Sequence, residues 1–410
     1  MGTTNYQLPI THYHLYTVKT DGERVNNIPP VDLAQQYKTI QEEVNAAVLG
    51  ILSSGRYIGG SSVEGFEQQF ASYTGIRECV GCNSGTDALY LALRALGIGP
   101  GDQVITTPFT FFATAEAISA VGATPVFVDI DAQTFNLDVN QLEAAITDQT
   151  KAILPVHLFG QPVEMTRLMA IANAHHLAVI EDCAQATGAE WAGQKVGSIG
   201  HIGCFSFFPT KNLGACGDGG AVTTNDPAIA ASIRRLREHG ATSRYHHESI
   251  GINSRLDALQ AAILQIKLRH LDTWNTQRHA VATRYHDLLS PLSGLILPQA
   301  PEGGKSVWNQ YTIRVISQDG SESKTPGEVP PAVSWRDRIR SHIQERGVSS
   351  MVYYPIPLHL QPVYQSLGYQ SGSFPVAETA CREVLSLPMF PELSIEQQQQ
   401  VVYCLKDTLG

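Results

Sequence analysis

A regular alternation of short apolar strands with helices, between about residue 78 and residue 225, constrains the fold of this chain more than any other feature. Strands that are buried on both faces and separated by helices are typical of a layered α/β sheet whose strands are mostly parallel. Ligands of such sheets bind at the carboxyl ends of the strands, where the loops gather. The expected strands are Glu78–Cys82, Gln103–Thr106, Pro125–Asp129, Ala152–His157, Ala178–Glu181, Cys204–Phe208 and Ala221–Thr224.

The segments around this sheet predict how the rest of the chain is organised. Apolar residues at helical spacing follow Asp32, which we expect to cap a helix. A long helix over 256–289 should link two domains. The expected units are an N-terminal arm at 1–30, a large domain at 31–275, and a smaller C-terminal α+β domain at 276–410 with a polar surface insertion at 318–334.

Composition excludes several classes of protein. The chain has 410 residues, of which 43% are hydrophobic, so a large core is available and extensive disorder is excluded. Its net charge of -10 gives no overall attraction to nucleic acid or to an anionic membrane. No apolar run approaches the roughly 18 to 20 residues that span a bilayer, and the N-terminus lacks a secretory signal pattern. Seven scattered cysteines favour reduced thiols, and we expect a cytoplasmic protein.

Three segments carry residues suited to catalysis, although each has an ordinary explanation when taken alone. In CNSGTDALYLAL, Gly85 and Thr86 open a helix directly after a strand, where free N–H groups can bind an anion. Many strand-to-helix turns look similar. In VIEDCAQATGA, Asp182 lies at the rim of the sheet, where a helix N-cap is the simpler role. In CFSFFPTKNLGACGDGGAV, Ser206 lies on a strand and Lys211 follows among aromatic residues and glycines, whereas a lone lysine is normally a solvated surface charge.

Together the three segments match what a pyridoxal 5'-phosphate (PLP) site needs. A helix N-terminus and Ser206 would hold the phosphate, and Asp182 would keep the pyridine nitrogen protonated so that the ring withdraws electrons. Lys211 would carry the aldehyde as a Schiff base, because a lysine held in such a site can have a lowered pKa. The order of phosphate loop, acid and lysine is more specific than any one of its parts.

Seven segments follow one another in a fixed order along the chain: NSGTDAL, TTPFTFFATAEAI, VIEDCAQATGA, FSFFPTKNLGACGDGGAV, GINSRLDALQAAIL, YYPIPLHLQPVY and VLSLPMFP. In these segments the chain resembles the nucleotide-sugar aminotransferases of the DegT/DnrJ type, which are fold-type I PLP enzymes. The likeness runs from about Val31 to the C-terminus. It implies a large domain whose mostly parallel central sheet is flanked by helices, a smaller C-terminal α+β domain, and a homodimer with shared active sites.

The resemblance also implies which residues bind the cofactor. Without it, the aromatic side chain in TFFAT would be read as core packing and the amide in CAQAT as a helix-surface group. With it, Gly85, Thr86 and Ser206 contact the phosphate, Phe111 stacks on the pyridine ring, Asp182 pairs with the ring nitrogen, Gln185 lies near the ring hydroxyl, and Lys211 is both the Schiff-base lysine and the proton shuttle.

Four further residues are expected on the substrate side or at a shared site. Asn253 matches a residue that reaches the phosphate of the neighbouring subunit in these dimers. Arg255 resembles a residue that meets an anionic group of the substrate, with a structural salt bridge as an equal alternative. Tyr354 and His359 match residues that line the sugar side of the pocket, although Tyr353 stands where close relatives often have His.

The implied reaction is PLP-dependent transfer of an amino group from L-glutamate to a nucleotide-linked keto sugar, in amino sugar or polysaccharide biosynthesis. KNLGACGDGGAV and YHHESIGINSRLDALQAAIL resemble the enzymes that act at C3, so we expect a UDP- or dTDP-linked 3-keto hexose or uronic acid. The alternatives are a C4 sugar aminotransferase, an aminotransferase for an aminocyclitol or a small amino acid, and a non-catalytic regulatory homologue. Relatives that remove a hydroxyl group from the sugar carry His in place of the Schiff-base lysine, so Lys211 disfavours that activity.

Two patterns that suggest metal binding are given structural explanations. Cys79 and Cys82 form a CxxC pair, but no second pair or suitable His pair accompanies them, so two core thiols in a strand are expected. The run from His246 to Glu248 fits a loop on the substrate side better, because adjacent histidines rarely point the same way. No metal site is therefore expected.

Overall fold

The computed structural model describes residues 27–316 and 334–409. The predicted arm at 1–30 and the predicted insertion at 318–334 lie outside the described residues, apart from 27–30 and Ser334. A domain boundary at residue 275 stays a prediction. In the part that is described, no helix has both the length and the apolar character needed to cross a bilayer.

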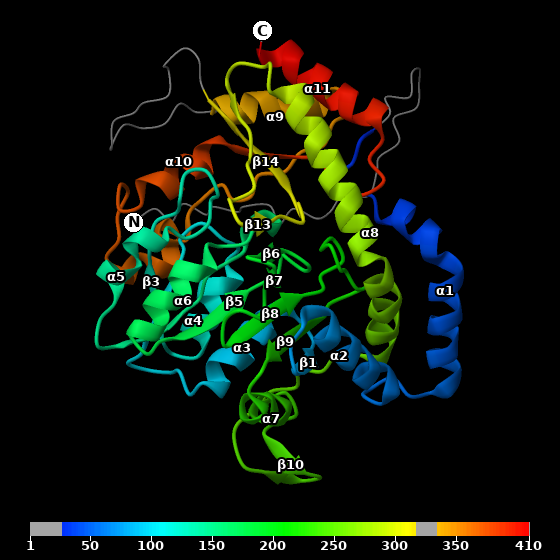
Figure 1. Ribbon diagram of the computed structural model, residues 1–410, viewed down its shortest axis with the longest axis vertical. Helices are drawn as coiled ribbons and strands as arrows, with labels where there is room; N and C mark the ends of the chain where they lie inside the picture. The colour runs from blue at the N-terminus through cyan, green and yellow to red at the C-terminus, as the bar shows by residue number, and fades with distance from the viewer. Residues whose placement is uncertain (1–26, 317–333, 410) are drawn as a thin grey trace, which may run out of the picture.

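A seven-stranded sheet forms the centre of the molecule (Figure 1). Its strand order is β1-β9-β8-β5-β4-β2-β3, and every adjacent pair is parallel except the two that include β9. The mostly parallel sheet expected from the sequence is therefore confirmed. The strands are β1 (Glu78–Cys82), β2 (Gln103–Thr106), β3 (Thr124–Phe127), β4 (Thr150–Ile153), β5 (Ala178–Asp182), β8 (Ile202–Ser206) and β9 (Gly220–Thr224).

Helices cover both faces of this sheet. Side chains alternate between the two faces along each strand, and both faces are apolar, so each must be covered. In β5, Ile180 packs in one apolar cluster and its neighbour Val179 packs in another. The first face is covered by α3 (Gly85–Ala95), α4 (Ala113–Ala120) and α7 (Pro227–Leu236). The second face is covered by α2 (Ser61–Thr74), α5 (Leu142–Ala145), α6 (Met165–Ala174) and the first half of α8 (Ala258–Leu289).

The second half of α8 leaves the central sheet and packs into a separate apolar cluster (Figure 1). An antiparallel sheet in the order β12-β14-β15 lies in this cluster. Tyr285 on α8 and Tyr311 on β14 are both fully buried there. The elements are β12 (Leu295–Ile296), β14 (Tyr311–Val315), β15 (Val384–Leu387), α9 (Trp335–Glu345) and α11 (Ile395–Leu409), with α10 (Pro375–Glu383) beside them.

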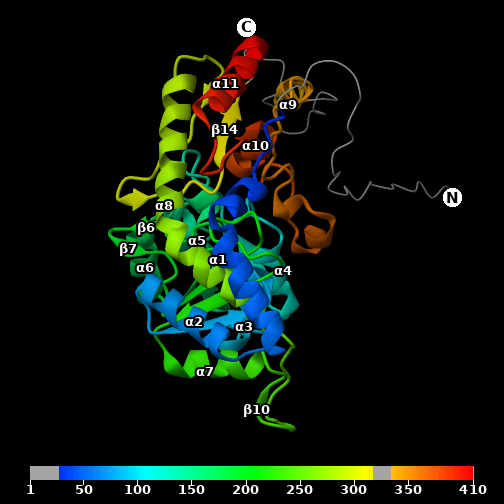
Figure 2. The ribbon, with the colours of Figure 1, turned by 90° about the vertical axis from the view of Figure 1, so that its right-hand side faces the viewer.

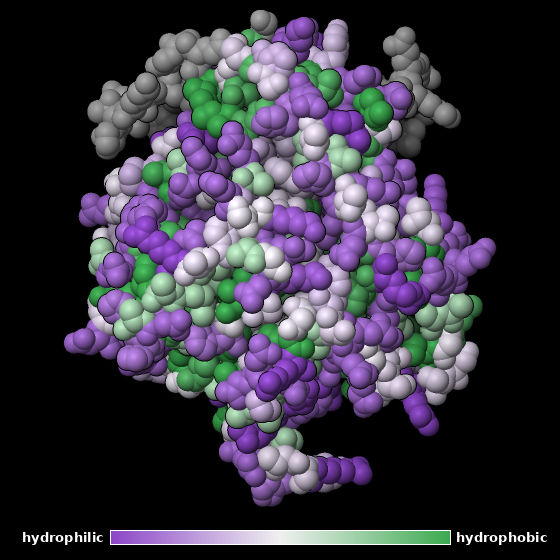
Figure 3. Space-filling model, viewed as in Figure 1, coloured by the Kyte–Doolittle hydropathy of each residue, from purple (hydrophilic) through white to green (hydrophobic). Residues whose placement is uncertain are grey.

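The first described helix and two small strand groups lie at the periphery. Asp32 caps α1 (Leu33–Ser54) by accepting a hydrogen bond from the Gln35 N–H at 2.9 Å, as predicted, and α1 runs along α8 (Figure 2). A hairpin of β10 (Ala241–Ser243) and β11 (His246–His247) projects from the body, next to α7 in Figure 1. The remaining strands form the order β13-β6-β7, with bounds Gly304–Lys305, Glu190–Trp191 and Gln194–Lys195. The face in Figure 3 is mostly hydrophilic, with apolar residues in scattered groups.

Candidate active site

Two polar side chains end neighbouring parallel strands and lie on the same face of the sheet. Asp182 is the last residue of β5 and Ser206 is the last residue of β8. Each lies two residues beyond a core residue of the first face, Ile180 and Cys204 respectively, and therefore points to the same side. That side is covered by α3 and α4. Asp182 and Ser206 thus lie between the carboxyl edge of the sheet and the start of these two helices.

The beginning of α3 forms a cradle against Ser206. Ser84 caps the helix through its hydroxyl group, and the N–H groups of Gly85 and Thr86 have no acceptor within the helix because they belong to its first turn. A Cβ atom on Gly85 would lie 2.6 Å from the Cβ of Ser206, so this close approach requires glycine. Oγ of Ser206 accepts a hydrogen bond from the Phe208 N–H at 3.3 Å and keeps its own hydrogen to donate. The cradle therefore presents donors to an anion.

Lys211 follows β8 in a turn that closes with a hydrogen bond from its own N–H to the carbonyl oxygen of Phe208, at 2.9 Å. Burial of the amine lowers the pKa of Lys211 to about 8, and the negative charge of Asp182 opposes this shift. A lysine with this pKa holds a substantial neutral fraction near neutral pH. A neutral amine is the form that attacks a carbonyl carbon.

Asp182 is nearly buried, with 4% of its surface exposed. Its Oδ2 accepts a hydrogen bond from Oγ1 of Thr114 at 2.9 Å, and its Oδ1 accepts one from the Ala184 N–H at 3.1 Å. Burial raises the pKa of Asp182, while these two bonds and the charge of Lys211 act in the opposite direction. The carboxylate keeps lone pairs for a further donor, such as a protonated ring nitrogen.

Gln185 joins the sheet edge to Tyr354 through its amide. Its Oε1 accepts a hydrogen bond from the Phe159 N–H at 2.7 Å, so its Nε2 is the atom that donates to the Tyr354 hydroxyl, at 3.0 Å. The Tyr354 oxygen accepts that bond and keeps its own hydrogen. Burial raises the pKa of Tyr354, so the phenol stays neutral and can donate. Phe111 is 59% exposed with its ring 6.3 Å from that of Tyr354, which leaves an aromatic face available beside the site.

Asn253 and Arg255 flank Ser254, whose hydroxyl group donates to Oδ1 of Asn83 at 3.2 Å, just before the start of α3. Asn253 is exposed, and its backbone pairs with Glu238. Arg255 donates from Nη1 to Oε2 of Glu238 at 3.2 Å, which is the structural salt bridge that the sequence left as an alternative. Among the described residues, no hydrogen bond or ion pair joins Asn253 or Arg255 to Lys211. The roles expected of Asn253 and Arg255 stay predictions.

His359 lies among buried side chains near Glu378. Its ring is fully buried in the C-terminal part of the chain, where Nε2 lies 3.1 Å from Oε1 of Glu378 and the ring packs 4.8 Å from Phe374. Glu378 also accepts hydrogen bonds from the Gly372 N–H at 2.8 and 2.9 Å. His359 therefore helps to hold the 371–378 turn together and presents no surface to a ligand in this chain. The expectation that it lines the sugar side stays a prediction.

Several buried polar residues behind the site were not expected from the sequence. Glu181 is fully buried and accepts hydrogen bonds from three N–H groups of the 197–200 loop, at 2.6 to 2.9 Å. Its fourth partner is Nε2 of His157, at 3.0 Å. The period-two alternation of a strand could have shown that Glu181 and Asp182 point to opposite faces. The loop that Glu181 binds leaves no comparable signal in the sequence.

The group of His157, Glu181 and Cys183 is close enough to be compared with a metal site, but its nitrogen and oxygen atoms are already paired. Nδ1 of His157 accepts the Val163 N–H at 3.0 Å, and Nε2 faces Glu181. The CxxC thiols also lie apart: Cys79 packs with the apolar cluster on the second face and Cys82 with that on the first. Burial raises the pKa of Cys82 to about 12, as expected of a core thiol.

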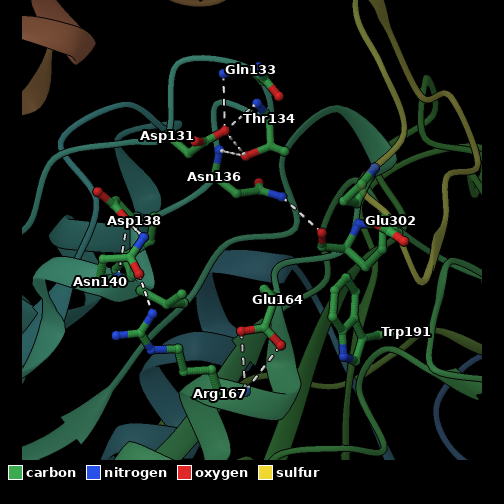
Figure 4. A pocket seen from close by; sticks show the side chains of 14 residues that line it. Asp131, Gln133, Thr134, Asn136, Asp138, Asn140, Glu164, Arg167, Trp191 and Glu302 are labelled. Atoms are coloured by element: carbon green, nitrogen blue, oxygen red, sulfur yellow. Dashed lines mark hydrogen bonds between the residues drawn. The ribbon is translucent and has the colours of Figure 1, made fainter.

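A surface cavity of about 400 Å³ lies away from these residues (Figure 4). Its polar groups serve local structure: Asp131 accepts hydrogen bonds from the Gln133 and Thr134 N–H groups, and Glu164 caps α6 through the Arg167 N–H. None of the residues expected to bind cofactor or substrate lines this cavity. We therefore place the candidate site at the sheet edge.

Comparison with known proteins gives the relatives of this chain. A pleiotropic regulatory protein of Geobacillus stearothermophilus is 48% identical over 92% of this chain and 97% of its own length. A UDP-N-acetyl-3-dehydro-α-D-glucosamine 3-aminotransferase of Acidithiobacillus ferrooxidans is 46% identical over 93% and 98%. A dTDP-3-amino-3,4,6-trideoxy-α-D-glucose transaminase of Streptomyces venezuelae is 43% identical over 93% and 96%.

Solved structures agree with these relatives. The crystal structure of Streptomyces venezuelae DesV in complex with a ketimine intermediate superposes with a TM-score of 0.87, at 43% identity, and covers 93% of this chain and 98% of that one. The family model of the DegT/DnrJ/EryC1/StrS aminotransferases matches residues 38–406. The resemblance read from the sequence is confirmed: this chain belongs to the DegT/DnrJ/EryC1/StrS aminotransferase family.

Proposed function

We propose that this chain binds PLP through Lys211 and transfers an amino group from L-glutamate to C3 of a nucleotide-linked keto sugar. The observation that carries the proposal is the convergence of Lys211, Asp182 and the Gly85–Ser206 cradle at one edge of the sheet. The charge of Asp182 acts on the amine of Lys211, so the two groups share one electrostatic environment. An amine, a carboxylate and an anion cradle are the three groups that PLP requires.

The donors and acceptors of this site fit PLP group by group. The N–H groups of Gly85 and Thr86 and the free hydroxyl hydrogen of Ser206 suit the phosphate. The remaining lone pairs of Asp182 suit the protonated ring nitrogen. The exposed ring of Phe111 suits stacking, and the second Nε2 hydrogen of Gln185, which is not used by Tyr354, suits the ring hydroxyl.

PLP, when bound, supplies an electrophilic aldehyde and a ring that withdraws electrons from the carbon attached to the substrate nitrogen. The residues of this chain supply the proton chemistry. Nζ of Lys211 accepts and returns a proton near neutral pH, because its pKa is about 8. Asp182 holds the ring proton, and its nearly complete burial strengthens that electrostatic interaction.

The substrate assignment is supported by what two relatives are named for. The Acidithiobacillus ferrooxidans and Streptomyces venezuelae proteins are both named as transaminases for the amino group at C3 of a sugar. The sugar is linked to UDP in the first and to dTDP in the second. Both are related to this chain over more than nine-tenths of its length. We therefore propose C3, and we leave both nucleotides as candidates. The Tyr354 hydroxyl, which can donate, is the group we assign to a sugar oxygen.

We also propose that the active unit is a homodimer with shared sites, in the cytoplasm. Asn253 is exposed in its own chain, which suits a residue given to a neighbouring site. An apolar group at the end of α1, the α1-end patch, is 46–62% exposed and consists of Leu49, Leu52, Tyr57 and Ile58. Exposed apolar groups of this kind support a protein interface. The free state of all seven cysteines supports a reducing compartment.

A regulatory function is the second candidate, because a relative at 48% identity is named as a regulatory protein. The two candidates differ in what the site must retain. A protein that only regulates does not need a lysine with a pKa of about 8 beside a buried carboxylate. We therefore favour catalysis.

The deciding experiment offers the purified protein matched 3-keto and 4-keto nucleotide sugars, each as UDP and dTDP forms, with ¹⁵N-labelled L-glutamate. We expect label in the 3-amino product and none with the Lys211→Ala variant. Label found only in a 4-amino product would refute C3. Absence of both transfer and a PLP absorbance band would favour the regulatory candidate.

A further inference from the structure

Three buried side chains form a continuous hydrogen-bonded row that ends on Asp182. Oγ1 of Thr110 lies 3.0 Å from Oγ1 of Thr114, and Oγ1 of Thr114 lies 2.9 Å from Oδ2 of Asp182. Thr110 is 3% exposed, Thr114 is 1% exposed and Asp182 is 4% exposed. Buried hydroxyl groups usually bond to backbone or water, so a row that ends on a charged side chain calls for a specific explanation.

The direction of each bond in this row is fixed by simple counting. A carboxylate only accepts, so Thr114 must give its single hydroxyl hydrogen to Asp182. The contact between the two threonines therefore requires Thr110 to donate and Thr114 to accept. Each hydroxyl group points its dipole toward Asp182, and bonds in such a row strengthen one another.

We propose that Thr114 is a positioning residue for Asp182: its hydroxyl fixes the orientation of the carboxylate and helps to hold its negative charge where a ring nitrogen binds. This inference rests on the proposed PLP site. Thr114 lies in the first turn of α4, three residues after Phe111, so one short segment would place both the stacking ring and the support of the carboxylate. The Ala184 N–H binds the other oxygen of Asp182, and together the two bonds leave little freedom for the side chain to rotate.

Other charged or titratable groups also face Asp182, and the test must separate their effects. The charge of Lys211 favours its ionised form. Burial raises the pKa of Cys183, Cys204 and Tyr354, and the charge of Asp182 adds to this in the same direction. None of these groups is altered when the Thr114 hydroxyl is removed. A change confined to Asp182 in a Thr114 variant is therefore assigned to the lost hydrogen bond.

The variants are chosen so that the shape of the side chain at position 114 and its ability to donate a hydrogen bond change separately. Thr114→Val keeps the branched shape and removes the donor, whereas Thr114→Ser keeps the donor. Thr106→Val is the matched control, because Thr106 is also fully buried but donates to the backbone oxygen of Leu154, at 2.8 Å. Asp182→Asn identifies the carboxyl signal.

The first measurement uses the protein without cofactor. Selective ¹³C labelling of aspartate carboxyl groups and NMR follow the titration of Asp182. We expect a higher pKa in Thr114→Val, a value near that of wild type in Thr114→Ser, and no change in Thr106→Val. An unchanged Asp182 titration in Thr114→Val would overturn the proposal. If Thr114→Val does not fold, Thr114→Ala is titrated in its place against the same control.

The second measurement uses the PLP-loaded protein. A hydrogen bond to a charged group changes an equilibrium by about tenfold or more, but this bond also forms without PLP. We therefore expect PLP to dissociate severalfold, and at most about tenfold, more readily from Thr114→Val than from Thr114→Ser. Equal PLP affinity in these two variants would count against positioning. A raised Asp182 pKa in Thr114→Val together with no PLP binding by wild type would support the hydrogen-bond role and refute the proposed function, so the two failures are distinguishable.

Discussion

At the scale of single residues, the reactivity of Lys211 follows from its burial. In the cofactor-free protein we expect the rate at which an amine reagent modifies Lys211 to rise with pH around a midpoint of about 8, because burial favours the neutral amine. In Asp182→Asn the midpoint should fall, since the negative charge that stabilises the ammonium form is removed. Modification of Lys211 and of the exposed Lys305, followed by mass spectrometry of the same samples, measures this directly.

Lys305 serves as the internal standard for the reagent. A midpoint for Lys211 at the ordinary value of a lysine, or one that rises in Asp182→Asn, would contradict the electrostatic account of the site. The direction of the pKa change separates two causes. Loss of the Asp182 charge lowers the pKa of Lys211, whereas better access of water to the amine would raise it.

Gly85 carries the second prediction at this scale. Gly85→Ala puts a Cβ 2.6 Å from that of Ser206, so the start of α3 and the end of β8 must move apart. We expect PLP affinity to fall by about tenfold or more, the effect of losing roughly one charge-assisted hydrogen bond. Fluorescence titration of the cofactor measures this. Gly99→Ala is the control, because its nearest neighbour would lie at 3.6 Å; equal losses in both variants would show that the cradle is not responsible.

At the scale of elements, Glu181 ties strand β5 to the 197–200 loop through three backbone N–H groups. Glu181→Gln removes the charge and replaces one accepting oxygen with an NH2 group. That group then faces N–H groups of the loop, which are also donors. We expect the free energy of unfolding to fall by about 3 kcal/mol, as for other buried charged groups that lose their partners. Urea unfolding followed by circular dichroism measures this. Glu190→Gln, at a partly exposed pair with Lys305, should cost less than about 1 kcal/mol.

The elements that could be predicted are those whose signal is local. Apolar runs placed all seven central strands, although the strand expected at Ala152–His157 ends at Ile153. Pro155 follows there and has no N–H for the ladder. Helix α2 was not predicted, although Val63, Phe66 and Phe70 lie at helical spacing and are buried. Thr114 was missed because its partner Asp182 is distant in sequence, and only the packing of α4 on the sheet brings them together.

At the scale of the whole molecule, the α1-end patch and Asn253 predict an obligate pair of chains. Leu49→Glu places a charge in an apolar group and should convert the protein to monomers in sedimentation velocity, with loss of activity. Ile395→Glu is the matched control, because Ile395 is 52% exposed on α11 and lies outside that patch. A dimer that persists in Leu49→Glu, or equal dissociation in both variants, would remove the patch from the interface.

Shared sites make a separate prediction. Lys211→Ala and Asn253→Ala are each expected to be inactive, and mixed dimers should regain activity, because one of their two sites has both residues intact. Activity of the mixture after joint unfolding and refolding is compared with that of each variant treated alone. Full activity of Asn253→Ala by itself would show that this residue is not supplied to a site.

The long helix α8 limits how the molecule can move. Its 32 residues extend for about 48 Å without a break, and they pack first on the central sheet and then around the C-terminal sheet. Rotation of one part against the other would have to bend this continuous rod. Access to the site should therefore be governed by loops at the sheet edge, and the radius of gyration in solution X-ray scattering should stay nearly constant when substrate binds.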